Sequence, residues 1–387
     1  MHSDSSPLFH PFIFDNGLVL RNRIVMAPMT TWSATPDGNI SDEELRFYRS
    51  RAKDVGMVIT GCTHVTASGM GFTDEFAAHD DRFIPSLRRL AAAAKSGGAR
   101  AILQIFHAGN KAVVDAVPHA EIVSASAVNA LSGPFNRGDV TPRALSQEEV
   151  AEMVLAFGDA TRRAIEAGFD GVELHGAHGF LLQNFLSPRY NLRQDTWGGS
   201  LEKRAQFPLA VVREVKRVIA THASQPFLLG YRISPEERED GGYRLPDMHA
   251  FVDTLIAEGI DYLHASLNDV LGARPLGDDP RLTVQQLIAH VGGRVPLMAA
   301  GALRTPKQAG DALALGLSLV AVGKGLVMNQ DWVALAQSSS EAAIRQTLDA
   351  DRRDELVIPQ GLWRAMAASP GWIPVRPVGS GVGQPGR

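Results

Sequence analysis

Two histidines three positions apart, His175 and His178, are the residues of this sequence whose type and spacing point most directly to chemistry. A histidine pair can bind zinc, supply a general base, or donate hydrogen bonds to an anionic or carbonyl oxygen. Zinc is disfavoured because the sequence has no HExxH motif and no convincing third ligand near the pair. We therefore predict a metal-free site, in which a general base and a hydrogen-bond donor remain alternatives.

A cation and an amide interrupt apolar segments elsewhere in the chain. Arg232 lies in LLGYRISPEE and Gln104 lies in ILQIF. A buried cation costs free energy without an anionic partner, and a buried amide needs hydrogen-bond partners. Arg232 therefore indicates either a bound group that carries negative charge or a salt bridge to a carboxylate such as Glu173. Cys62 is expected to be a small packing residue, because no base accompanies it.

Glycines follow two of the apolar runs near the C-terminus. Gly301 follows the run 296–300, and Gly323 and Lys324 follow the run 319–322. Glycine lets backbone N–H groups approach a ligand closely, and lysine adds positive charge, so the pattern favours phosphate binding. The alternative is that these glycines only turn the chain.

The elements that must position these residues are eight short apolar runs separated by helical stretches. Capping boxes at Ser41/Glu44 and Ser146/Glu149 open two of the helices. No GxGxxG follows any run, which disfavours an open doubly wound sheet. The alternation predicts an α/β fold, a (β/α)8 TIM barrel with its site at the C-terminal ends of the strands. The runs are residues 24–27, 57–60, 101–106, 171–174, 227–232, 262–265, 296–300 and 319–322.

Three segments fall outside this alternation. The sequence FDNGL at residues 14–18 predicts a β-hairpin that plugs the bottom of the barrel. Residues 107–145 are too long for a simple loop after the third strand and predict a lid. The barrel is assigned to residues 1–350 and a C-terminal tail to residues 351–387, whose last ~10 residues, rich in glycine and proline, are expected to be disordered.

The composition excludes several classes of protein. The 387 residues carry a formal net charge of −4, which gives no basic surface for nucleic acid. No apolar run approaches the ~18 residues of a membrane span, and the N-terminus does not resemble a secretory signal. The single cysteine cannot form an intrachain disulfide, so we expect a cytoplasmic protein. Trp363 and Arg364 are expected to pack on this chain's own barrel mouth or on that of a second copy in a homodimer.

The chain resembles the old yellow enzyme family of FMN-dependent NAD(P)H oxidoreductases, the ene-reductases, over roughly residues 8–340. The most specific match is HGAHGFLLQNFLSPRYNLRQDTWGGSLEKR at residues 175–204, which is similar to the family's paired active-site histidines and the loop with a GGS turn. NRIVMAPMT in the first run and ILQIFHAG in the third support the resemblance. One cysteine cannot hold an iron–sulfur cluster, so the single-domain form is implied.

The resemblance implies a tightly bound FMN at the barrel mouth, with NAD(P)H as a dissociable reductant. Thr30 would lie near O4 of the flavin and Gln104 at its pyrimidine edge. Arg232 would lie beside N1 and O2, where negative charge develops on reduction. The implied cofactor-binding residues are Pro28, Met29, Thr30, Cys62, Gln104, Arg232, Gly301, Ala302, Gly323 and Lys324.

The implied reaction passes hydride from NAD(P)H through flavin N5 to an electron-poor small molecule, such as an activated alkene, a nitro compound or a quinone. His175 and His178 would be catalytic, because hydrogen bonds to the acceptor's oxygen withdraw electron density. Trp32 and Phe180 would line the substrate pocket. No metal is implied.

Phe180 departs from the family pattern, which places a proton-donating tyrosine two residues after the second histidine. A phenyl ring cannot donate a proton, so we hypothesise that water or another acid serves. The other phenols considered are Tyr190, Tyr231 and Tyr243. Two alternative functions follow from the residues: a flavin-free lyase or aldolase with Lys324 as Schiff-base lysine, and a flavin-binding barrel impaired by Phe180.

Overall fold

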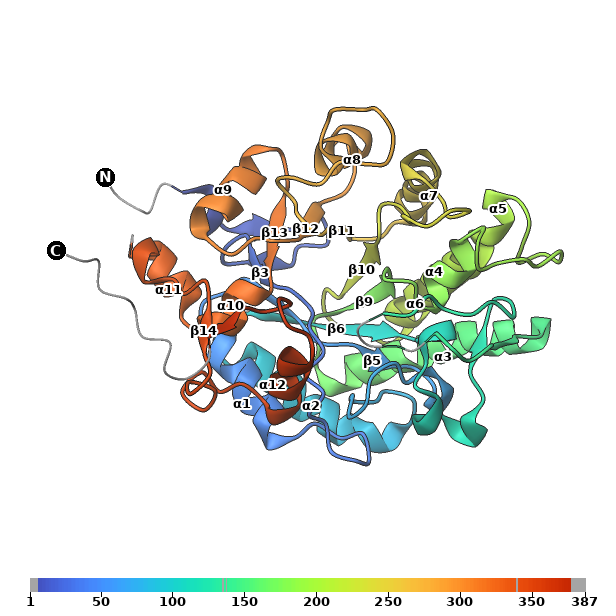
Figure 1. The fold of residues 1–387 in the computed structure, drawn as a ribbon, viewed down its shortest axis with the longest axis horizontal. Coiled ribbons are helices and arrows are strands. Elements are labelled where there is room, and N and C mark those ends of the chain that lie inside the picture. Colours follow the sequence, from blue (N-terminus) through green and yellow to red (C-terminus); the bar gives the residue numbers. More distant parts are fainter. Residues whose placement is uncertain (1–5, 134–135, 137, 339, 377–387) are drawn as a thin grey trace.

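The structure is a computed structural model that describes residues 6–133, 136, 138–338 and 340–376. Eight parallel strands form a closed barrel, because β3 pairs with both β4 and β13 and the remaining strands connect these two in order (Figure 1). The (β/α)8 prediction is therefore confirmed. The barrel strands are β3 (Ile24–Met26), β4 (Met57–Ile59), β6 (Arg100–Phe106), β9 (Gly171–Gly176), β10 (Leu228–Ile233), β11 (Tyr262–Ser266), β12 (Leu297–Ala300) and β13 (Leu319–Val322).

Helices surround this barrel, and their ends follow the capping signals in the sequence. Ser41 and Ser146 each accept the expected backbone N–H, from Glu44 and Glu149, which completes both capping boxes. The helices are α1 (Asp42–Arg51), α2 (Ile84–Lys95), α3 (Gln147–Ala167), α4 (Leu181–Leu186), α5 (Leu201–Arg204), α6 (Gln206–His222), α7 (Leu245–Glu258), α8 (Thr283–Val291), α9 (Pro306–Ala314), α10 (Lys324–Met328), α11 (Trp332–Gln337) and α12 (Gln360–Ala368). None of the helices within the described residues is long and apolar enough to cross a bilayer.

An antiparallel hairpin lies at the N-terminal ends of the barrel strands. It consists of β1 (Phe12–Ile13) and β2 (Val19–Leu20). Phe14 between them is buried in the same apolar cluster as side chains of the barrel interior. Asn16 in the turn donates to the carbonyl oxygen of Phe227, immediately before β10, over 3.4 Å. The opposite end of the barrel is therefore left for the site.

A long segment follows β6 at this opposite end. The chain between β6 and α3 forms short 3-10 turns, including Gly109–Lys111, and the pair β7 (Val123–Ser124) and β8 (Arg143–Ala144). A further two-residue strand, β5 (Thr63–His64), pairs with the end of β6.

The C-terminal segment packs against its own barrel. The N–H of Gly361 donates to Ser33 Oγ over 3.0 Å, and Arg51 Nη2 donates to the carbonyl oxygen of Leu356 over 2.8 Å. Trp363 is half-buried against the main core and Arg364 is exposed. Strands β14 (Leu348–Asp349) and β15 (Val375–Arg376) pair on either side of α12. The predicted disordered end, residues 377–387, lies outside the described residues.

Candidate active site

Two adjoining cavities, of about 460 and 320 Å³, lie at the C-terminal ends of the barrel strands. Both are lined by Pro28, Met29, His178, Arg232 and Trp372, so an elongated ligand can extend from one into the other. The larger cavity is also lined by Thr30, Trp32, Cys62, Gln104, His175 and Phe180, and the smaller one by Gly301, Ala302, Gly323 and Lys324. The structure therefore brings together all the site residues selected from the sequence.

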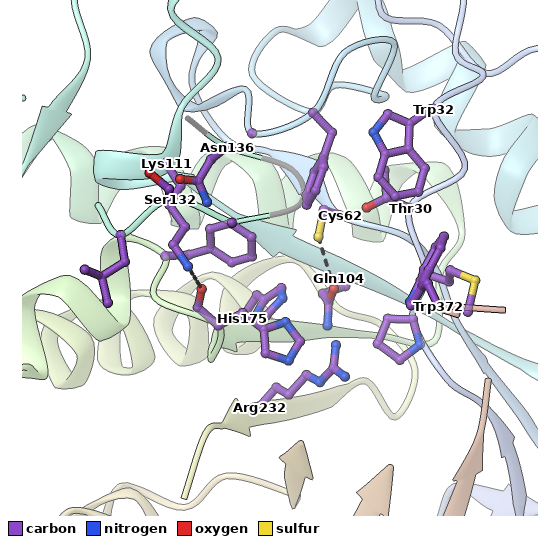
Figure 2. A pocket seen from close by; sticks show the side chains of 18 of the residues that line it. Thr30, Trp32, Cys62, Gln104, Lys111, Ser132, Asn136, His175, Arg232 and Trp372 are labelled. Carbon is purple, nitrogen blue, oxygen red and sulfur yellow. Dashed lines mark hydrogen bonds between the residues drawn. The ribbon is translucent and has the colours of Figure 1, made fainter. Parts of the chain in front are cut away.

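Ser266, the last residue of β11, connects the arginine to one of the histidines. Arg232 Nη2 donates to Ser266 Oγ over 3.0 Å, and the same oxygen lies 2.7 Å from His178 Nε2. Arg232 Nε is buried and has no hydrogen-bond partner among the described residues. The guanidinium at the junction of the two cavities thus retains a buried donor (Figure 2).

Glu173, the carboxylate that the sequence suggested as a partner for Arg232, forms hydrogen bonds with other residues. Glu173 Oε1 accepts a hydrogen bond from Gln104 Nε2 over 2.7 Å, and Oε2 lies 2.9 Å from His264 Nδ1. Within the described residues Arg232 forms no ion pair with Glu173 or another carboxylate, so the salt-bridge alternative is wrong. Burial lowers the pKa of Arg232, and the negative charge of nearby Glu173 opposes that shift.

Cys62 lines the larger cavity. Its Sγ donates to Gln104 Oε1 over 3.5 Å. Burial raises the pKa of the thiol to about 12, so Cys62 stays protonated at neutral pH and is not a nucleophile.

The two histidines are neutral hydrogen-bonding groups. His175 Nδ1 accepts the backbone N–H of Ala177 over 3.3 Å, so Nε2 carries the proton of the neutral ring. Burial lowers the pKa of both histidines well below 6.5, and the positive charge of Arg232 lowers both pKa values further. Within the described residues, no cluster of three His, Cys, Asp or Glu side chains could hold a metal ion. A base with so low a pKa is weak, so this arrangement favours hydrogen-bond donation over proton abstraction.

A pH profile tests these pKa shifts. Both imidazoles stay neutral above their lowered pKa values. We therefore expect the rate of flavin reoxidation by an activated alkene to show no pH-dependent transition near pH 6.5. The measurement is anaerobic stopped-flow between pH 5.5 and 8. A sigmoidal change with a midpoint of about 6.5 that disappears when His175 or His178 is replaced would contradict the assignment.

The smaller cavity combines a backbone turn with three cations, Arg232, Arg304 and Lys324. Gly301 follows β12 with φ of 152°, and Ala302 has φ of 53°. Lys324 begins α10 beside Gly323, and burial lowers the pKa of Lys324. Arg304 lines the same cavity, and its buried Nε has no partner among the described residues. Such a set of groups suits a phosphate.

Gly301 should not tolerate a side chain. A Cβ at this position would lie 2.3 Å from the carbonyl oxygen of Leu267, and its φ is one that L residues rarely adopt. We expect Gly301→Ala to lower the free energy of unfolding by about 1–3 kcal/mol and to weaken FMN binding. Urea unfolding of the apoprotein and FMN titration measure the two effects.

Gly310→Ala in α9 is the matched control, because nothing lies within 4 Å of its Cβ position. This change should leave FMN affinity unaltered and stabilise the helix by about 0.5–1 kcal/mol. Equal effects of the two substitutions would show that Gly301 has no special role.

Aromatic side chains form the apolar wall of the larger cavity. The Trp32 ring lies 5.3 Å from that of Phe72 and 5.9 Å from that of Trp372, with edge-to-face geometry. Phe180 lies 4.8 Å from the His175 ring, also edge to face. Figure 2 shows Trp32 and Trp372 on one side of the cavity and Lys111 on the other.

Several lining residues were not selected from the sequence, among them Ser266, Arg304, Lys111 and Trp372. Ser266 ends a barrel strand, so the rule that places the site at the C-terminal ends of the strands could have found it. Arg304 and Lys111 lie in the loops that follow β12 and β6. No motif around Trp372 indicated a site residue, because Trp372 reaches the cavities only through the packing of the C-terminal segment.

The residues present fit the FMN that the sequence resemblance implies. The unpartnered Nε of Arg232 would donate to an anionic ring edge, and that of Arg304 would donate to a phosphate in the smaller cavity. Pro28 and Met29 line both cavities and provide apolar surface between these ends. A planar ring with a phosphorylated chain therefore has a complementary group at each end.

Comparison with known proteins agrees with this interpretation. The model of the NADH:flavin oxidoreductase / NADH oxidase family matches residues 7–342. The chain is 43% identical over 380 residues to the probable NADH-dependent flavin oxidoreductase YqiG of Bacillus subtilis, covering 97% of this chain and 100% of the relative. It is 38% identical to the NADH:fumarate oxidoreductase of Klebsiella pneumoniae, covering 92% of this chain but only 38% of that longer protein.

Solved structures show the same architecture. Morphinone reductase superposes with a TM-score of 0.73 at 26% identity, covering 86% of this chain and 90% of that protein. An old yellow enzyme homologue from Zymomonas mobilis superposes with a TM-score of 0.76 at 24% identity, covering 92% and 98%, and shows the fold alone. The chain therefore belongs to the NADH:flavin oxidoreductase / NADH oxidase family, that of the old yellow enzymes, and is an NAD(P)H-dependent FMN oxidoreductase.

Proposed function

We propose that this oxidoreductase reduces an alkene conjugated to a carbonyl or carboxylate group, using NADH as its reductant. Bound FMN supplies the chemistry of accepting and releasing a hydride. His175 and His178 bind the oxygen of the conjugated group and polarise the alkene. The single observation that carries the proposal is the hydrogen bond that fixes the His175 proton on Nε2, in a ring that lines the larger cavity.

We infer further roles for residues around the histidines. Arg232 would balance negative charge at the pyrimidine edge of bound FMN. Ser266 Oγ contacts both Arg232 and His178 and so fixes the position of one side chain relative to the other. The aromatic wall of Trp32, Phe72 and Trp372 excludes water from the reacting carbon atoms.

The names of two relatives favour an alkene as the acceptor. The NADH:fumarate oxidoreductase and the NADH:acrylate oxidoreductase of Vibrio harveyi are both 38% identical to this chain, which spans 38% and 36% of their lengths. Fumarate and acrylate are alkenes conjugated to carboxylates. The flavin-free lyase alternative is wrong, because the family is one of flavin oxidoreductases.

The test is a pair of anaerobic stopped-flow measurements on the FMN-loaded protein. NADH should bleach the flavin absorbance, and 2-cyclohexenone or acrylate should restore it with formation of the saturated product. Restoration by quinones or nitro compounds alone would overturn the alkene assignment. A yellow protein that NADH never bleaches would identify the impaired flavin-binding barrel.

A further inference from the structure

Reduction of an alkene needs a proton as well as a hydride, and no tyrosine among the described residues lines either cavity. Phe180 occupies the position expected for the donor, and its ring has no acidic proton. Tyr243 donates its hydroxyl to the carbonyl oxygen of Ser234, and Tyr231 is buried against Phe251. Tyr190 is also buried and is absent from the lining of both cavities. The phenols considered from the sequence therefore do not replace the missing donor.

Lys111 carries acidic N–H groups and lies in the larger cavity close to Phe180. Its side chain lines the larger cavity, and its Nζ lies 6.0 Å from the centre of the Phe180 ring. Nζ donates one hydrogen bond, of 2.6 Å, to the carbonyl oxygen of His178. An ammonium group has three N–H bonds, and this contact uses one of them.

The turn that carries the second histidine also holds this lysine in position. His178 and Gly179 have positive φ values of 60° and 72°. A Cβ at residue 179 would lie 2.9 Å from Lys111 Nζ, so glycine leaves space for the ammonium group. The backbone therefore couples the position of Lys111 to that of His178.

Two other groups at the cavity that carry a polar hydrogen, Cys62 and Arg232, are less suited to donate a proton. Cys62 has a pKa raised to about 12 and donates to Gln104. Arginine is never deprotonated in proteins, which excludes Arg232. Burial lowers the pKa of Lys111 from its ordinary 10.5, with Glu237 and Glu239 opposing the shift, which makes this ammonium a better donor than an exposed lysine.

We propose that Lys111 is the catalytic acid that protonates the α-carbon of the substrate. This step rests on the proposed alkene reduction. Bound FMN would supply a hydride, which forms a C–H bond at the β-carbon, while the π electrons of the alkene move toward the oxygen held by the histidines. In the same step the electron pair of the developing enolate takes a proton from Lys111 Nζ, so that a C–H bond forms and an N–H bond breaks. Water at the rim of the cavity beside exposed Glu239 returns a proton to the amine.

The test compares two acceptors with one preparation of reduced holoenzyme. 2-Cyclohexenone needs a proton on carbon, whereas 1,4-benzoquinone takes its protons on oxygen, where exchange with water is fast. We expect Lys111→Met to slow reoxidation by cyclohexenone about 100-fold relative to reoxidation by benzoquinone. Lys111→Arg, which keeps the charge without a transferable proton, should be equally slow. Adding Phe180→Tyr to Lys111→Met should restore much of the rate.

Lys307→Met is the matched control, because Lys307 is 75% exposed on α9 and its loss changes the net charge equally. The ratio of the two rates should be unaltered in this variant. An unaltered ratio in Lys111→Met, or recovery in Lys111→Arg, would overturn the proposal, and the second result would indicate a purely electrostatic role. If wild-type enzyme fails to reduce cyclohexenone, the proposed function fails instead, so the two failures are distinguishable.

Discussion

Replacing His175 or His178 with alanine should slow reoxidation of the reduced enzyme by cyclohexenone by about 10²–10³-fold. The hydrogen bonds from these rings strengthen as negative charge develops on the substrate oxygen. Their loss therefore raises the barrier to hydride transfer more than it weakens substrate binding. Because both rings act on one oxygen, the double variant should lose less than the product of the two single effects.

Anaerobic stopped-flow absorbance of the flavin measures this rate directly. His222→Ala is the matched control, since His222 is exposed at the C-terminal end of α6, away from the cavities. The flavin spectrum of each variant reports whether the cofactor site is intact. A loss of the same size in His222→Ala, or unaltered reoxidation in both active-site variants, would rule out the polarising role.

Arg232→Met should lower the midpoint potential of the bound flavin and weaken FMN binding. A hydrogen bond to a charged group contributes about 1.5–3 kcal/mol, which corresponds to roughly 30–65 mV for a two-electron couple. The potential falls because the reduced flavin carries more negative charge at its pyrimidine edge than the oxidised form. Arg232 is also a buried cation without an ion pair among the described residues. The apoprotein should therefore not be destabilised by its replacement.

A dye-coupled reductive titration measures the potential, and urea unfolding measures the stability of the apoprotein. Arg304→Met provides the contrast, because Arg304 lines only the smaller cavity, at the phosphate end. This variant should bind FMN more weakly and keep the wild-type potential. If both arginine variants shift the potential equally, then Arg232 has no specific contact with the flavin ring.

The sequence predicted the barrel correctly, because parallel strands that are buried on both faces consist of nearly continuous runs of apolar residues. It also selected Arg232 and Gln104, because polar side chains within such runs must find partners. Capping boxes predicted two helix starts for a similarly local reason, since Ser41 and Glu44 satisfy each other's backbone groups within one turn. The paired histidines and their loop identified the family from one contiguous segment.

The hydrogen-bond partners of the buried polar side chains could not be predicted from the apolar runs. Glu173 is two residues from His175 and was a reasonable partner for Arg232, yet it bonds Gln104 and His264. These groups come from different strands, and barrel closure sets which of them meet. The interaction depends on the register between neighbouring strands, which apolar runs specify only approximately.

The sequence by itself determined the barrel, the order of its strands and the polar residues at their ends, because burial and turn geometry leave local patterns in the chain. Tertiary structure decided the rest. Three segments that are far apart in the sequence each bring one residue to the cavities: Lys111, Arg304 and Trp372. These residues reach the cavities because the loops and the C-terminal segment pack on the barrel mouth. The free energy of that packing depends on the whole contact surface and leaves no local pattern in the sequence.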